Sequence, residues 1–213
     1  GQTGIALYAG KLTLEHVILQ AETGVACWGG EELIIAAGTV ITSGDYGVFV
    51  EATKRETPRI VVSGSVTAAV SVGTGEFNDG EVTIELHDPV ELKSTDENGA
   101  AIRQNRGFLN VTGGVIDGKV DVAELVEANV TGGQFTDQDS ASKLLDGDLV
   151  MDENGNVVHA GNLENVVARV DSETFETLQV AVDAADGKTV TLLKSVQENV
   201  VVPENSTVTL DLN

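Results

Sequence analysis

Short apolar stretches recur along the first part of the chain at intervals of about 20 residues. Those that open each period occupy residues 4–7, 24–27, 47–50 and 69–72. A second set of predicted strands lies between them, at 12–15, 33–36 and 60–63. Each of these is followed by a turn and a further short apolar piece, at 17–19, 40–41 and 66. Apolar and polar residues alternate within the strands, which predicts one face directed into a core and the other toward solvent.

The clearest repeat is the pentapeptide Asn-Val-Thr-Gly-Gly, which occupies residues 110–114 and again 129–133. A recurrence after about 20 residues is typical of one coil of a solenoid. Because so short a unit cannot bury its own apolar face, we expect the coils to stack, with parallel strand pairing at about 4.8 Å per coil. The fold class predicted is therefore all-β, a parallel β-helix.

Stacking of equivalent positions makes a specific prediction about the two pentapeptides. Asn129 should lie over Asn110, and Thr131 over Thr112, with the asparagines forming an inward or corner ladder. The glycines of the pentapeptide are expected to take backbone angles that a side chain would forbid.

Polar, turn-rich stretches interrupt the period in the middle of the chain. They occupy residues 75–80 and 94–99 and bracket strands predicted at 82–86 and 90–92. A further loop, at 53–58, projects from an earlier coil. Loops of this kind are where a solenoid carries function, and also where it tolerates insertions.

The regular pattern ends after the second pentapeptide. A short helical turn is predicted at 140–145, followed by a hairpin at 148–158 around an Asn-Gly turn. An open solenoid end exposes unpaired strand edges, so we expect these elements to cap the stack.

Residues 161–213 have a different character. A small hairpin is predicted from 166–170 and 174–175, and strands at 189–193, 200–202 and 207–212. Between them lies one short helix, N-capped by Thr177 and followed by Gly187. Its apolar stripe consists of Leu178, Ala181, Val182 and Ala185.

The C-terminal residues resemble a known family. FETLQVAVDAADGKTVTLLK at 175–194, ENV at 198–200 and TVTLDLN at 207–213 are similar to a module of large repetitive cell-surface proteins of Gram-positive bacteria, and residues 131–158 resemble that family's closing turn. In that family a hairpin and a helix cap the first turn of a right-handed parallel β-helix. The resemblance implies a right-handed helix, secretion and an adhesin-like or structural role, and it carries no catalytic residues across.

The order of these pieces departs from the family. Coils with a closing turn come first, at 1–160, and the module that resembles an opening cap follows, at 161–213. We therefore expect the chain to be a piece of a longer array. We also expect head-to-tail self-association through 161–213, because such a module can dock on a neighbouring solenoid end.

Charge narrows the choice of partners. The chain has 34 acidic residues against 12 Lys and Arg, a net charge of −22. Binding to nucleic acid or to an anionic membrane needs clustered basic residues, so neither is expected as a partner. The sequence contains no apolar run of about 18 residues, so no membrane insertion is expected.

Few residues suggest chemistry. The histidines His16, His87 and His159 are far apart and lack metal-ligand spacing, so no metal site and no cofactor are expected. Cys27 is the single cysteine and is expected to be a buried apolar residue. The stretch that begins at Asp152 starts like a calcium loop but has Val157 where such a loop needs glycine, which favours a hairpin turn.

The candidate ligand-binding residues are aromatic. Trp28, Tyr46 and Phe49 fall on neighbouring coils, and Tyr8 occupies a similar point in the first coil. Packing at the edge of the core is the alternative interpretation of these rings. Asp117 and Asp137 are the carboxylates that an enzyme would use, but so acidic a solenoid produces such pairs by chance, and we assign no catalytic residue.

The sequence thus predicts a non-catalytic extracellular module of the bacterial cell surface, either adhesin-like or a structural spacer. Its partner would be a host or dietary glycan or a surface protein. The alternative is a carbohydrate-binding or carbohydrate-active β-helix, similar to glycoside hydrolases or lyases.

Overall fold

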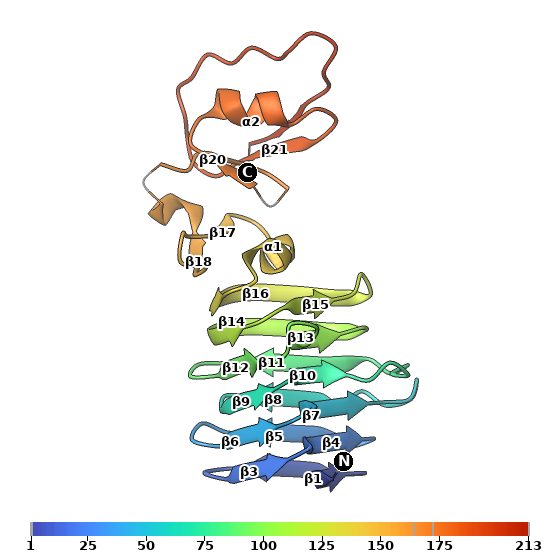
Figure 1. Ribbon diagram of the computed structural model, residues 1–213. Helices are drawn as coiled ribbons and strands as arrows, with labels where there is room; N and C mark the ends of the chain where they lie inside the picture. Colours follow the sequence, from blue (N-terminus) through green and yellow to red (C-terminus); the bar gives the residue numbers. More distant parts are fainter. Residues whose placement is uncertain (1, 164, 172, 213) are drawn as a thin grey trace.

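The computed structural model describes residues 2–163, 165–171 and 173–212. Coils of short β-strands are stacked along one axis, and a hairpin and a small α/β module follow the stack (Figure 1). Every strand pair between successive coils is parallel, as in the pairing of β1 with β4 and of β2 with β5. The chain is a parallel β-solenoid, which confirms the predicted fold class.

One face of the stack is a six-stranded sheet to which each coil contributes one strand. In order these are β1 (Thr3–Leu7), β4 (Thr23–Trp28), β7 (Tyr46–Glu51), β10 (Val70–Thr74), β13 (Ala100–Gln104) and β15 (Val120–Val122).

The other sheet has ten strands arranged as two rows that meet at one long strand. The first row is β2 (Lys11–Leu14), β5 (Glu32–Ile35), β8 (Arg59–Val62) and β11 (Val82–Leu86). The second row is β3 (Ile18–Ala21), β6 (Val40–Ser43), β9 (Ser65–Ala68) and β12 (Glu91–Ser94). Both rows pair with β14 (Gly107–Asp117), which pairs in turn with β16 (Val126–Phe135).

The core is built from columns of equivalent residues. Leu33, Ile60, Ile84 and Leu109 follow one another in register through the first row, and all four are fully buried. Val25, Val48, Val72 and Ile102 form a matching column on the six-stranded sheet. Residues of similar size therefore stack along the axis, which keeps the interior close-packed from coil to coil.

The pentapeptide repeat is confirmed in part. Asn129 is the register partner of Asn110, as predicted, but Thr112 pairs with Gly132, so the prediction of Thr131 over Thr112 is wrong. A register shift after Val111 causes this difference. A side chain at position 132 would meet the carbonyl oxygen of Thr112, so the shifted position requires glycine.

The asparagines also face the opposite way from an inward ladder. Leu109 and Val111 are buried on either side of Asn110, whereas Asn129 is exposed. Because side chains alternate along a strand, the burial of these two apolar neighbours places the asparagines on the outer face.

The interruption predicted in the middle of the chain is wrong. Strand β11 pairs with β8 and β14, and β12 pairs with β9 and β14, so the stack continues through this region without a break. The predicted turn-rich stretches are the loops between β10 and β11 and between β12 and β13.

The predicted closing elements are present at the end of the stack. They are α1 (Gln138–Ala141), the 3-10 turn Ser142–Leu144 and an antiparallel hairpin of β17 (Leu149–Met151) and β18 (Val157–His159). The hairpin is joined to β16 because the Phe135 N–H donates to the Gly155 carbonyl at 2.9 Å. Ala141 belongs to the core of the stack.

The C-terminal module has its own apolar cluster. A second 3-10 turn (Ala160–Asn162) precedes β19 (Ala168–Val170), β20 (Glu173–Phe175), α2 (Leu178–Ala184), β21 (Thr189–Leu192) and β22 (Thr209–Asp211). The predicted cap is confirmed, since the Thr177 hydroxyl accepts from the Val180 N–H. The predicted stripe of α2 is buried: Leu178, Ala181, Val182 and Ala185.

The strand predicted at 200–202 is wrong. Val201 and Val202 are exposed, and the backbone of Val201 is bonded to a side chain rather than to a strand. The Gln179 amide accepts from the Val201 N–H at 2.8 Å and donates to the Val201 carbonyl at 2.9 Å. This side chain satisfies the backbone groups that a sheet would otherwise pair.

We predict that Ile84→Ala destabilises the stack by about 2–5 kcal/mol, because the buried side chain lies in register between Ile60 and Leu109 and the cavity cannot be filled. Urea unfolding followed by circular dichroism measures the loss. The control is Thr83→Ala, on the outer face of the same strand. Equal losses for both variants would contradict the assignment of the core column.

Candidate functional site

Four aromatic rings form a continuous ladder on the outer face of the six-stranded sheet. The ring centroids of Tyr8 and Trp28 are 5.5 Å apart in a stacked arrangement. Trp28 and Phe49 lie 6.0 Å apart, and Phe49 and Tyr46 lie 5.0 Å apart, both edge to face. These geometries are the favourable ones for aromatic pairs.

Strand register brings the rings together. Leu7 pairs with Cys27, and both side chains point inward, so the next residues, Tyr8 and Trp28, point outward in adjacent coils. Phe49 pairs with Ala26 in the next coil along. The aromatic ladder, defined as Tyr8, Trp28, Tyr46 and Phe49, thus unites the three predicted ligand-binding residues with Tyr8. Its role in binding stays a prediction.

A hollow of about 280 Å³ adjoins the ladder at Trp28. It is lined by Trp28, Glu51, Ala52, Thr53, Glu56, Phe77 and Asp79. The Phe77 side chain is 81% exposed. Sequence reasoning missed Phe77, although a lone aromatic residue inside the polar loop at 75–80 was a visible signal.

The loop that carries Phe77 is anchored by buried hydrogen bonds. Asn78 is only 5% exposed, and its side chain accepts from the Ala52 N–H and donates to the Gly80 carbonyl, each at 2.9 Å. It also donates to the Asn105 side chain at 2.9 Å. On the facing loop, the Glu56 carboxylate accepts from the Thr53 N–H at 2.7 Å. Both walls of the hollow are therefore held in place.

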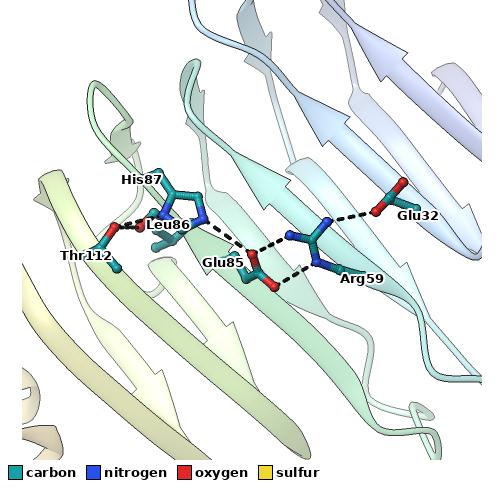
Figure 2. A network of polar contacts seen from close by, with 6 residues as sticks. All are labelled: Glu32, Arg59, Glu85, Leu86, His87 and Thr112. Atoms are coloured by element: carbon teal, nitrogen blue, oxygen red, sulfur yellow. Dashed lines mark hydrogen bonds and ion pairs between the residues drawn. The ribbon is translucent and has the colours of Figure 1, made fainter.

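A polar ladder runs along the outer face of the ten-stranded sheet. Figure 2 shows Arg59 between Glu32 and Glu85, at 2.8 Å from the first and as close as 2.6 Å to the second. His87 continues the line, 3.3 Å from Glu85 and 2.8 Å from the Thr112 hydroxyl. The hydrogen bond from Arg59 lowers the pKa of Glu85, and the same guanidinium lowers that of Glu32.

The acid pair considered for catalysis is used in other ways. The Asp137 carboxylate accepts from the Ser140 N–H at the start of α1 and from the Val120 N–H at 3.0 Å. Burial opposes ionisation of Asp137, but these bonds outweigh it and lower its pKa. Asp117 lies 3.7 Å from the Lys93 ammonium. Both carboxylates thus have structural partners.

The structure keeps the three histidines in separate surroundings. His159 lies 2.9 Å from Asp148 and His87 belongs to the polar ladder, whereas His16 adopts a positive φ of 54°. In the described residues, no group of three or more His, Cys, Asp or Glu side chains is arranged to hold a metal ion.

Two sequence interpretations are confirmed. Cys27 is buried, and its burial raises the pKa of the thiol. Asp152 forms a hairpin turn, because one carboxylate oxygen accepts from the backbone N–H groups of Asn154 and Asn156, each at 2.9 Å. Hydrogen bonding from Asn156 lowers the pKa of Asp152.

The fold and the aromatic ladder define a parallel β-solenoid with an exposed aromatic surface. No family model, curated protein or solved structure matches the chain. Within the part of the chain that the structure describes, no helix has the length and apolar character needed to cross a membrane.

We predict that Glu85→Gln lowers stability at pH 7 by about 1 kcal/mol, since the ion pair with Arg59 is partly exposed. The folded-state pKa of Glu85 is lowered, so its contribution is present above the usual carboxyl pKa and is lost as pH falls through the lowered value. Thermal unfolding at pH 7 and about pH 3 should therefore show the variant and the wild type converging in acid.

The control for this experiment is Glu127→Gln, an exposed position on the outer face of β16. Its stability difference from the wild type should be small at both pH values. A difference for Glu85→Gln that stays constant between the two pH values would contradict the assigned role of the Arg59 ion pair.

Proposed function

We propose that the protein is a non-catalytic, adhesin-like module of a repetitive cell-surface protein of a Gram-positive bacterium. The solenoid acts as a rigid rod outside the cell and presents a binding surface on its side. The resemblance of residues 175–213 to such proteins supports a location at the cell surface. The uninterrupted stack of coils supports a role as a rigid rod. The net charge of −22 keeps such an array soluble.

The observation that carries this proposal is the aromatic ladder. Tyr8 is 67% exposed and Trp28 is 37% exposed, although large aromatic side chains bury much apolar area when they can. Trp28, Tyr46 and Phe49 lie on paired strands, and Tyr8 directly follows β1, so the positions of the rings are largely fixed before any partner arrives. An exposed and pre-organised aromatic surface is typical of recognition sites.

Carbohydrate binding is the second candidate function. Tyr8, Trp28 and Phe49 come from consecutive coils, so the ladder runs along the solenoid axis. A line of rings along the axis suits an extended ligand such as a polysaccharide, whose sugars can pack against aromatic side chains. This arrangement favours glycans among the possible ligands of the ladder.

We predict that the labelled protein binds a subset of host or plant glycans, or of host surface proteins, on an array, and that Tyr8→Ala weakens this binding about tenfold by removing an exposed ring of the ladder. Dissociation constants for the best ligands measure the effect. Phe108→Ala is the control, because Phe108 is 41% exposed but lies on the other sheet. Absence of binding to any arrayed ligand, or equal weakening by the control, would reject the adhesin-like role.

Self-association through 161–213 also stays a prediction. Leu210 and Leu212 at the end of this module are exposed, at 46% and 70%. If they contact a neighbouring copy, sedimentation velocity should show a mean mass that rises with concentration, and Leu212→Lys should suppress the rise. A monomer at all concentrations would contradict this prediction.

A further inference from the structure

The hollow beside Trp28 combines aromatic walls with carboxylates. Trp28 comes from the end of β4, Phe77 comes from the loop after β10, and Glu51 to Thr53 form the corner between them. The acidic lining residues are Glu51, Glu56 and Asp79. The exposed ring of Phe77 is held there by the buried side chain of Asn78, so its exposure is built into the loop.

Among the described residues of the solenoid, the carboxylates of the hollow have no cationic partner. Within residues 2–163, no lysine or arginine nitrogen forms an ion pair with Glu51, Glu56 or Asp79. Arg55 does not line this hollow but lines a second one, to which Glu56 also contributes. The site therefore has formal negative charge and aromatic side chains together, and both can attract a cation.

The size of the hollow limits what can enter it. At about 280 Å³ it lies just below the range of roughly 300–1,000 Å³ typical of pockets for whole small-molecule ligands. A single long side chain matches this volume better than an oligosaccharide does. A lysine side chain can place its methylene groups against the rings and its ammonium among the carboxylates.

We propose that this hollow binds a lysine side chain on a basic segment of a partner protein. The inference rests on the proposed function as a binding module and names the partner class for one site on it. The net charge of −22 supports a basic partner, because the field of the whole molecule steers positive surfaces toward the protein. The rings and carboxylates of the hollow then determine where one lysine side chain binds.

Trp28 is the chain's single tryptophan and lines the hollow, so its fluorescence responds to a ligand there, while the Phe77 and Asp79 variants below separate the hollow from the ladder that Trp28 also joins. The probe is a short peptide of alternating glycine and lysine, titrated into the full chain at physiological salt. Its matched ligand control is the same peptide with every lysine acetylated, which keeps the methylene stem and removes the charge. We expect a saturable change in emission with the lysine peptide, and binding at least about tenfold weaker with the acetylated one.

Two variants test the walls of the hollow, and two others serve as controls. Phe77→Ala and Asp79→Asn should each weaken binding of the lysine peptide about tenfold. Phe108→Ala removes a comparably exposed ring on the other sheet, and Glu97→Gln removes one charge from the exposed loop after β12. Both controls should bind as the wild type does, and matched thermal melts of all four variants show that the fold is retained.

Several outcomes would overturn the inference. Equal affinity for the acetylated peptide would remove the role of charge, and a tighter response to a neutral oligosaccharide would make the hollow a sugar site. If Glu97→Gln weakened peptide binding as much as Asp79→Asn does, the attraction would be diffuse and not due to a specific lysine-binding site. Absence of a saturable signal would also reject it. The array experiment with Tyr8→Ala tests the proposed function separately. If Tyr8→Ala weakens array binding but the lysine peptide does not bind, the lysine site is rejected and the proposed function stands.

Discussion

Parallel hydrogen bonding between successive coils is the interaction on which the other features of this molecule depend. Each strand takes its register from the coil before it, so an inward residue is followed by an inward residue and an outward one by an outward one. The column through Leu33, Ile60 and Ile84 fills the interior in this way. A slip of one residue in any coil would turn that coil's apolar residues out to solvent, so the core enforces the register that creates it.

The same register creates the outer surfaces, where neighbouring side chains repeat at the rise of the coil. Lys11, Glu32 and Arg59 are register partners in consecutive strands, and this alternation of sign lets the charges pair along the axis. On the other sheet the outward positions at one strand end hold Tyr8 and Trp28, and the rings stack. The same parallel backbone pairing thus produces a charged surface on one sheet and an aromatic surface on the other, because the outward side chains of the two sheets differ.

The sequence predicted the strands well because alternation within a strand and repetition between coils both reflect burial, as at Val82, Ile84 and Leu86. It could not predict the pairing of Thr112 with Gly132, since a bulge leaves no periodic signal. The apolar pattern at 200–202 predicted a strand. The backbone N–H and carbonyl of Val201 are instead hydrogen-bonded to the side chain of Gln179 in α2, a contact that the local pattern does not reveal. The repeat predicts three of the four ladder rings as ligand candidates, but it gives no signal for Phe77, which lies in a loop outside the repeat.

The acidic residues fall into two groups, those with a cationic partner inside the protein and those without one. This distinction says more about where a cation can bind than the net charge does. Glu32 and Glu85 share the guanidinium of Arg59, and their lowered pKa values reflect charges that the fold itself uses. Glu51 and Asp79 lie beside exposed rings, and no lysine or arginine of the solenoid coils pairs with them. A carboxylate with an internal partner gains little from a ligand, because binding would first have to break the existing pair. Carboxylates without such a partner have no pair to break, so the hollow suits a cation better than the polar ladder does.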